Sequence, residues 1–154
     1  MIQAAGLIHR AAVLYRKAVL DDIPALVQLG KEFHEENPII CGFDADSLEA
    51  SLRVWIATAI LLTDGKDAMI CGFVNPVYFN HSVLTAHELF WFVRKGKRNG
   101  AGKALLEAFR QEARARGATV HIQTASETGR IAAVDRLYRR QGFEPLERGY
   151  IKEL

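Results

Sequence analysis

The stretch from Glu88 to Gly117 reads ELFWFVRKGKRNGAGKALLEAFRQEARARG, and it decides the fold. Its first part, Leu89 to Val93, is apolar at every position, which predicts a strand buried on both faces in the middle of a sheet. A basic turn with Gly100 and Gly102 follows and leads into an amphipathic helix. Glycines let the backbone curl in front of the positive end of a helix, so this layout predicts an anion site for a phosphate-bearing ligand.

Two well-known phosphate loops do not match this turn. A Walker loop ending at Lys103 would need glycine at Lys97 and a hydroxyl residue where Ala104 stands. A dinucleotide-binding turn starting at Gly100 would need glycine or alanine where Leu105 stands. Both assignments are therefore excluded.

The turn resembles the pyrophosphate loop of the GNAT superfamily of acyl-CoA-dependent N-acetyltransferases, whose pattern is Gln/Arg-x-x-Gly-x-Gly/Ala between a central strand and a helix. The matching residues are Lys97, Arg98, Asn99, Gly100, Ala101 and Gly102. Lysine at the first position departs from the pattern: it keeps the positive charge of arginine but loses the planar guanidinium.

Two other segments resemble the same family. Residues 134–143 are similar to its "LY-x-x-x-GF" segment, with Tyr138 on the helix and Gly142 as the helix cap. Residues 15–26 resemble its first strand and first helix. The resemblance implies a mixed α/β fold: a mostly antiparallel sheet flanked by about four helices, with strands 89–93 and 120–124 splayed apart.

Composition and charge limit the classes of protein that fit. The chain has 154 residues, and we expect one domain over residues 13–154 with a possible N-terminal extension over residues 1–12. Lysine and arginine number 20 against 18 aspartates and glutamates, which argues against general nucleic-acid binding. The positive charge gathers instead around the loop, at Arg94, Lys95, Lys97, Arg98 and Lys103.

The cysteines and the apolar runs predict the setting of the protein. Cys41 and Cys71 are isolated, and the histidines lack metal-ligand spacing, so we expect no bound metal and a reducing cytoplasm. The longest apolar run, residues 54–62, is too short to cross a bilayer, so no membrane partner is expected.

The remaining elements are predicted from the periodicity of apolar residues and from the residues that cap helices or form turns. We expect a strand over 13–19, a helix capped by Asp21 or Asp22 that ends near Asn37, and a second helix capped by Asp46 or Ser47. Strands 59–62 and 68–74 form a predicted hairpin with a type I′ turn at Asp64-Gly65.

The last third of the chain has its own pattern. Gly117 is expected to end the helix after the loop. In strand 120–124, Val120, Ile122 and Thr124 are predicted on an apolar face, with His121 and Gln123 on a polar one. A helix over 129–140 and final strands within 143–151 complete the expected order.

The resemblance implies acetyl transfer from acetyl-CoA to a primary amine by direct attack in a ternary complex. Main-chain amides from Arg98 to Lys103 would hold the pyrophosphate, and the pantetheine arm would pair with the central strand like an added strand. The residues expected to bind the cofactor are Phe92, Val93, Arg94, Lys97, Arg98, Asn99, Gly100, Ala101, Gly102 and Lys103.

Two side chains are the predicted catalytic residues. An alkylamine with a pKa of about 10.4 is almost wholly protonated at pH 7, so attack on a thioester needs a base. By resemblance we expect Glu88 in that role, with His87 and His121 as alternatives. Tyr138 is expected to protonate the departing thiolate.

A second class of function stays open from the sequence. The chain could be a non-catalytic acyl-CoA-binding sensor or interaction module that keeps the cofactor cleft. The acceptor, whether a small molecule or a peptide amine, is not identified by any motif, and a homodimer is possible because dimers are common in the family.

Overall fold

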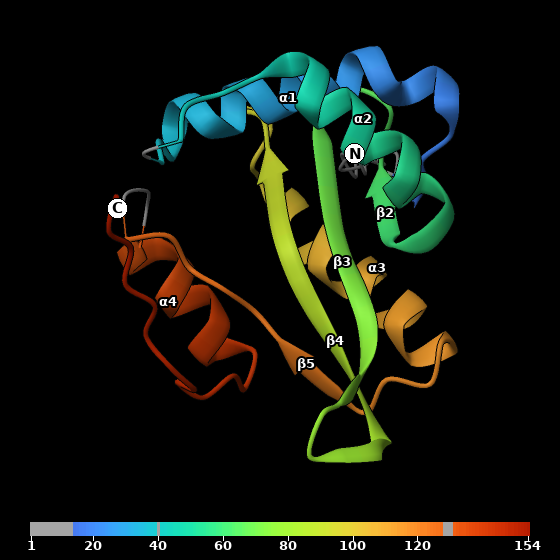
Figure 1. Ribbon diagram of the computed structural model, residues 1–154, viewed down its shortest axis with the longest axis vertical. Helices are drawn as coiled ribbons and strands as arrows, with labels where there is room; N and C mark the ends of the chain where they lie inside the picture. The colour runs from blue at the N-terminus through green and yellow to red at the C-terminus, as the bar shows by residue number, and fades with distance from the viewer. Residues whose placement is uncertain (1–13, 40, 128–130) are drawn as a thin grey trace, which may run out of the picture.

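The computed structural model describes residues 14–39, 41–127 and 131–154. These residues form one sheet with helices on both faces (Figure 1). The predicted extension, residues 1–12, lies outside the described part of the chain. The elements are β1 (Arg16–Lys17), a 3-10 turn (Leu20–Asp22), α1 (Ile23–Glu36), α2 (Ala45–Thr58), β2 (Ile60–Thr63), β3 (Ala68–Val77), β4 (Asn80–Val93), α3 (Ala101–Ala115), β5 (Val120–Ile122) and α4 (Ile131–Arg140).

The five strands lie in the order β1-β2-β3-β4-β5. The first four pair antiparallel, and β5 pairs parallel to β4, so the predicted mixed, mostly antiparallel sheet is confirmed. Only a crossover connection can make neighbouring strands parallel, and α3 supplies it between β4 and β5. In Figure 1, β5 leaves β4 at a shallow angle and leads toward α4.

Two clusters of buried side chains hold the layers together. On one face of the sheet, α1 and α2 bury Leu26, Leu29 and Leu52 against β2, β3 and β4. On the other face, α3 buries Leu105 and Phe109, as its spacing predicted. The central strand therefore has core on both sides, but only part of the predicted stretch is buried: Phe92 and Val93 are buried, Phe90 and Trp91 are half-buried, and Leu89 is 47% exposed.

A bulge in β4 changes which of its side chains face which layer. Cys71 pairs with Phe90, but its neighbour Gly72 pairs with Glu88, so Leu89 is an extra residue without a partner. Strict alternation would put Glu88 and Trp91 on opposite faces, whereas the inserted residue brings both to the α3 face. The strand is also longer than predicted, because it begins at Asn80.

Two predicted turn and cap features are wrong. A type I′ turn needs positive φ at both central residues, yet of Asp64 and Gly65 only Gly65 has it, at 80°. The Asp64 carboxylate instead accepts from the amides of residues 66–68 and shapes a longer loop. Similarly, α2 is capped by Asp44, which accepts from the Ser47 amide at 2.7 Å, and not by Asp46 or Ser47.

The ends of the described chain depart most from prediction. The first strand is shorter, at Arg16–Lys17, and residues 143–154 contain no strand. The strand predicted over 120–124 ends at Ile122, and its predicted apolar and polar faces do not separate: Val120 is 43% exposed, while Ile122 and His121 are both half-buried, His121 between the rings of Phe109 and Phe143. The last helix is described from Ile131, so the predicted start at residue 129 lies outside the described residues.

Candidate active site

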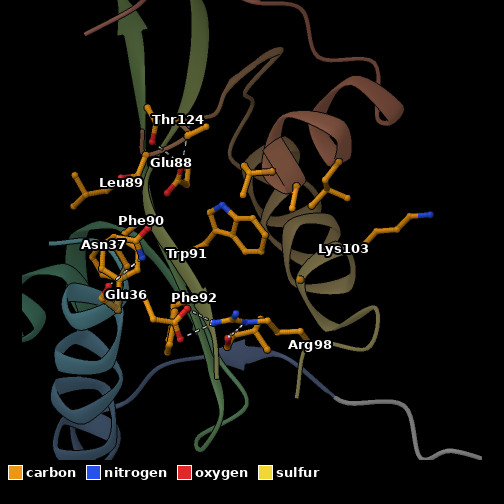
Figure 2. Close-up of a pocket in the computed structure, with 18 of the residues that line it drawn as sticks. Glu36, Asn37, Glu88, Leu89, Phe90, Trp91, Phe92, Arg98, Lys103 and Thr124 are labelled. Atoms are coloured by element: carbon orange, nitrogen blue, oxygen red, sulfur yellow. Dashed lines mark hydrogen bonds and ion pairs between the residues drawn. The ribbon is translucent and has the colours of Figure 1, made fainter. Parts of the chain in front are cut away.

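The central feature is a cavity where β4 and β5 part. Their pairing runs from Thr85 opposite Val120 to His87 opposite Ile122 and stops there. Beyond that point lies a cavity of about 410 Å³ (Figure 2). The predicted splay is therefore present. The lining residues come from α1, β4, the glycine loop, residues 124–126 and α4: Phe33, Glu36, Asn37, Glu88, Leu89, Phe90, Trp91, Phe92, Val93, Arg98, Gly100, Gly102, Lys103, Thr124, Ala125, Ser126, Ala133, Val134 and Leu137.

The glycine loop closes one end of this cavity. Gly100 caps α3 with φ of 76°, a left-handed conformation that favours glycine. Helical geometry leaves the N–H groups of Gly102 and Lys103 without an intrahelical acceptor, and the positive end of the helix dipole lies behind them. Both residues line the cavity, so the first turn of α3 lies at the cavity wall.

Gly102 also has a packing role that the motif did not reveal. A Cβ atom on Gly102 would lie 2.6 Å from Cζ3 of Trp91, closer than a real contact allows. The absence of a side chain therefore lets the indole ring pack directly on the first turn of α3. Trp91 lines the cavity on the same side (Figure 2).

The side chains of the loop differ in their exposure to the cavity and to solvent. Arg98 and Lys103, two of the residues predicted to bind the cofactor, line the cavity. Lys97 and Asn99 are exposed to solvent. Ala101 is half-buried, and its amide donates to the carbonyl of Arg98 at 3.2 Å, which tightens the loop.

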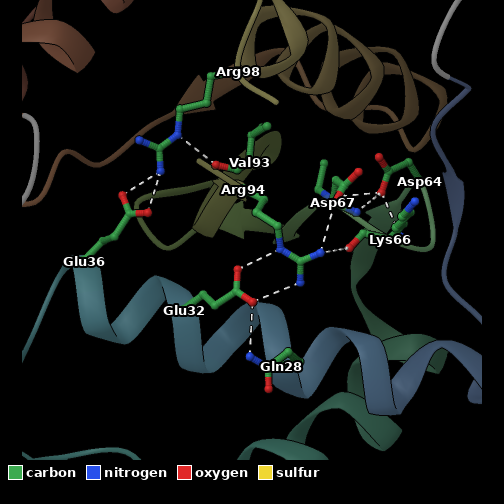
Figure 3. A network of polar contacts seen from close by, with 10 residues as sticks. Gln28, Glu32, Glu36, Asp64, Lys66, Asp67, Val93, Arg94 and Arg98 are labelled. Carbon is green, nitrogen blue, oxygen red and sulfur yellow. Dashed lines mark hydrogen bonds and ion pairs between the residues drawn. The ribbon is translucent and has the colours of Figure 1, made fainter. Parts of the chain in front are cut away.

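Arg98 folds back across the cavity mouth. Its Nε donates to the carbonyl of Val93 at 2.8 Å, and its Nη2 lies 2.7 and 2.6 Å from the two carboxylate oxygens of Glu36 (Figure 3). The guanidinium carbon is 5.7 Å from the centre of the Phe92 ring. Arg98 thus joins the glycine loop, β4 and the end of α1.

Arg94, also predicted to bind the cofactor, is turned away from the cavity. Its Nε and Nη2 donate to the Glu32 carboxylate at 2.8 and 3.0 Å, and its Nη1 donates to Asp67 at 3.0 Å (Figure 3). Its backbone amide donates to the Asp67 carbonyl at 2.8 Å. The structure therefore places Arg94 in a network that ties β4 to α1 and to the β2–β3 loop.

The hydrogen bond from the Arg94 amide to the Asp67 carbonyl shows which backbone groups of β4 face away from β3. Since the Arg94 amide points to β3, alternation along the strand directs the backbone of Phe92 to β3 as well. The backbone groups of Trp91 and Val93 then face the parted edge. Val93 and Phe92 were both predicted to pair with the cofactor arm through the backbone. Phe92 offers only its side chain to the cavity. Trp91 was not predicted in this role.

Glu88 lies where the two strands separate. Its side chain is buried, with the residue 3% exposed, and Oε2 accepts from the Thr124 amide at 3.2 Å and from the Thr124 hydroxyl at 3.1 Å (Figure 2). Burial raises the pKa of Glu88 to about 7, although the two bonds from Thr124 oppose the rise. A buried carboxyl that titrates near neutral pH and lines a cavity has the properties of a general base.

Tyr138, the predicted proton donor, is buried behind the cavity wall. Its hydroxyl accepts from Nε1 of Trp91 at 2.8 Å and lies 2.8 Å from the Thr124 carbonyl and 3.0 Å from Oε1 of Gln123. Burial raises the pKa of Tyr138 above its ordinary value, with the charge of Glu88 as a second cause. The hydroxyl therefore stays protonated and is held by Trp91 on β4 and by the backbone of Thr124.

The two histidines considered as alternative bases are differently placed. His87 is exposed and lies on β4 before the strands part. His121 is half-buried between Phe109 and Phe143, and burial, with the charges of nearby arginines, lowers its pKa to about 4. Of the three candidate bases, Glu88 is the one that lines the cavity.

Several lining residues were not predicted as site residues. Trp91 was interpreted only as a core residue of the strand, and Thr124 only as a member of the next strand. Phe33 and Glu36 lie at the end of α1 and Asn37 directly follows it, all of them more than 40 positions before the start of β4. Two signals existed for this last group: in the family that the chain resembles, the segment between the first two helices often contributes to the acceptor site, and the charges of Glu35, Glu36 and Asp44 could attract a cationic amine. The three carboxylates were instead interpreted as a solvated helix end and loop.

Among the residues that the structure describes, no group of three or more histidine, cysteine, aspartate or glutamate side chains is arranged to hold a metal ion. Within the same residues, no helix combines the length and apolar character needed to cross a membrane.

Comparison with known proteins agrees with this geometry. The model of the acetyltransferase (GNAT) family matches residues 23–143, which include the loop, β4, β5 and α4. A search of curated protein sequences finds no significant match.

Solved structures share the fold at low sequence identity. An acetyltransferase from Clostridium acetobutylicum, solved with acetyl-CoA, is 20% identical over 91% of this chain and 95% of its own, with a TM-score of 0.71. Ribosomal-protein-alanine N-acetyltransferase from Brucella melitensis is 15% identical over 91% and 97%, with a TM-score of 0.72. Glucosamine-6-phosphate N-acetyltransferase from Arabidopsis thaliana is 13% identical over 91% and 97%, with a TM-score of 0.68.

Proposed function

We propose that this chain, which belongs to the acetyltransferase (GNAT) family, transfers an acetyl group from acetyl-CoA to a primary amine. One observation supports the proposal above the others. A single cavity has a glycine loop with free helical N–H groups at one end and a buried carboxyl that titrates near neutral pH at the other. Acetyl-CoA carries a diphosphate, which the loop could hold, and a thioester, at which the attacking amine needs a base.

The donor would lie along the parted edge of β4. The N–H groups of Gly102 and Lys103, together with the positive end of α3, favour the diphosphate. The amide-bearing arm would then pair with the backbone groups of Trp91 and Val93 that face the parted edge, in the manner of an added strand. This direction brings the thioester toward Glu88, where the cavity ends because β4 and β5 begin to pair.

Glu88 would act as the base. At pH 7 a free alkylamine is deprotonated in about one molecule in ~2,500, a deficit of roughly 4.6 kcal/mol. A carboxyl with a pKa of about 7 is half ionised at that pH and can accept the proton directly or through a water molecule. The amine nitrogen attacks the thioester carbon, the C–S bond breaks, and CoA leaves as a thiolate that requires a proton.

Tyr138 remains the proposed source of that proton. Its raised pKa keeps the hydroxyl protonated at neutral pH, as a donor must be. The Thr124 carbonyl and Oε1 of Gln123 are both acceptors for the hydroxyl proton, so donation to sulfur would require this hydrogen bond to be exchanged. The Trp91 indole keeps the hydroxyl oxygen in place while that exchange occurs.

The test is a thiol-release assay with acetyl-CoA and a panel of primary amines, paired with calorimetric measurement of CoA binding. We expect CoA binding in the micromolar range and thiol release that depends on an added amine. Failure to bind CoA would refute the proposal. Binding without thiol release for any amine would support the alternative, a non-catalytic acyl-CoA-binding module.

A further inference from the structure

Arg98 and Glu36 form an ion pair inside the proposed cofactor site. The pair is bifurcated, since Nη2 of Arg98 lies 2.7 and 2.6 Å from the two oxygens of Glu36, and both side chains line the cavity. Each side chain is about one-third exposed, at 29% for Arg98 and 33% for Glu36. Charges of this exposure hold each other weakly enough to exchange partners.

The position of Arg98 suggests what its other partner would be. It belongs to the loop whose N–H groups face the cavity, and it also occupies the carbonyl of Val93 on the open edge of β4. A diphosphate bound at this loop is a doubly charged acceptor, for which a guanidinium is a strong donor. The cofactor arm and the Arg98 side chain would both use the Val93 carbonyl, so the side chain must leave it when the arm binds.

We propose that the diphosphate of the cofactor takes Arg98 from Glu36, and that the released carboxylate then binds a positively charged group of the acceptor. The inference rests on the proposed function. It assigns Glu36 to substrate recognition and defines the acceptor as an amine with a second, cationic group besides the nitrogen that attacks.

The surroundings of Glu36 support this class of acceptor. Beside it, the cavity wall is formed by the rings of Phe33 and Phe90 and by Asn37. The Asn37 side-chain amide donates to the Phe33 carbonyl at 3.0 Å, so it is already engaged. A partly buried carboxylate that loses its arginine is stabilised by another cation, and the aromatic faces nearby favour one. The neighbouring Glu32 cannot take this role because Arg94 holds both of its oxygens.

Calorimetry with CoA tests the exchange. Because the parent must break the ion pair to bind CoA, Glu36→Gln should bind CoA roughly two- to fivefold more tightly, as expected for a partly exposed pair. Glu35→Gln removes the same charge from the adjacent position, which does not line the cavity, and should leave the affinity unchanged. In an Arg98→Gln background, Glu36→Gln should have no effect, because nothing is left to release.

The second arm tests the acceptor. With acetyl-CoA and thiol release as the readout, the parent should favour 1,3-diaminopropane over propylamine, and Glu36→Gln should lose that preference through KM. A parent without the preference, or a Glu36→Gln variant that keeps it, overturns the assignment of Glu36 to the acceptor.

The calorimetric outcomes separate this inference from the proposed function. If the parent binds no CoA, the proposed function fails and the inference fails with it. If the parent binds CoA and Glu36→Gln binds it with the same affinity, the inference alone is overturned. Equal tightening by Glu35→Gln would also overturn it, since the effect would then come from net charge and not from the ion pair.

Discussion

The carboxylate of Glu88 accepts two hydrogen bonds from Thr124, one from the amide at 3.2 Å and one from the hydroxyl at 3.1 Å. This contact spans the gap immediately beyond the last paired residues of β4 and β5. The two bonds favour the ionised carboxylate, but burial disfavours it more, and the pKa settles at about 7. The point where β4 and β5 separate therefore also holds Glu88, a carboxyl whose pKa suits a general base at neutral pH.

Glu88→Gln should lower kcat by roughly 10²–10⁴-fold while CoA binding changes little, since the amide keeps the shape of the side chain but cannot accept the proton. In the parent, the rate should rise with pH through about 7 as Glu88 ionises. Amine deprotonation also raises rates with pH, so the comparison is between the parent and variant profiles. A variant with the parent profile would show that another group is the base.

The same variant makes a prediction about stability. The pKa of Glu88 is raised in the folded state from 4.5 to about 7, so the native protein binds the proton more tightly than the unfolded chain. The parent should therefore lose roughly 3 kcal/mol from this group as pH rises from about 4.5 to above 7. Glu88→Gln has no such loss.

Urea unfolding of both proteins at pH 4 and pH 8 measures this difference. We expect the free energy of unfolding of Glu88→Gln, taken relative to that of the parent, to be roughly 3 kcal/mol higher at pH 8 than at pH 4. A constant difference would mean that Glu88 titrates normally in the folded protein, and its role as a base near neutral pH would lose its support.

The parts of the site that the sequence predicted are those set by local geometry. The turn with Gly100 before α3 needs only a left-handed residue and a helix N-terminus, and both are encoded within a few positions. The position of the central strand was equally clear from its continuous apolar residues, although Leu89 is exposed and not buried as predicted. The splay came from the family resemblance, since no residue of β5 indicates where its pairing stops.

The parts that were missed depend on contacts between distant segments. The bulge at Leu89, which places Glu88 and Trp91 on one face, is a property of the register with β3 and leaves no signal in β4 alone. Arg94 and Arg98 look equivalent in the sequence as basic residues near the loop. Only the positions of Glu32 and Glu36, one helical turn apart on α1, give the two arginines separate partners.

Arg94 and Arg98 should therefore respond differently to substitution. Arg94→Gln breaks the contacts with Glu32 and Asp67 and should destabilise the fold by about 1–2 kcal/mol, with CoA affinity within about twofold of the parent. Arg98→Gln should instead weaken CoA binding. Urea unfolding and calorimetry on both variants check the contrast, and a large loss of CoA affinity in Arg94→Gln would return Arg94 to the cofactor site.

Gly100 should be necessary for cofactor binding through its backbone. It has φ of 76°, and a side chain would meet nothing within 4 Å, so the effect of Gly100→Val is conformational and not steric. Turning this residue out of the left-handed region reorients the N–H groups that face the cavity, and we expect CoA affinity to fall at least tenfold by calorimetry.

Gly96 provides the matched control for this prediction. It also has positive φ, 85°, and a Cβ atom added there would meet nothing within 4 Å, but it precedes the loop. Gly96→Val should cost similar stability and leave CoA affinity nearly unchanged. Equal loss of affinity in both variants would show that general strain, and not the anion site, is responsible.

The Tyr138 hydroxyl can be tested by separating its two possible roles. Tyr138→Phe removes the hydroxyl and leaves Nε1 of Trp91 and the Thr124 carbonyl without this partner, which should destabilise the fold by about 1–3 kcal/mol. Trp91→Phe breaks the same bond from the other side and keeps the hydroxyl. Both variants should therefore be less stable than the parent in urea.

Turnover then distinguishes a proton donor from a positioning group. If Tyr138 protonates the leaving thiolate, Tyr138→Phe should lose at least tenfold in kcat, and Trp91→Phe should lose much less because its donor remains. Equal losses in the two variants would assign the hydroxyl to holding β4 against Thr124. Parent-like turnover in Tyr138→Phe would exclude the proton-donor role and leave protonation of the thiolate to solvent, since the buried hydroxyl would then serve only the Trp91 and Thr124 contacts.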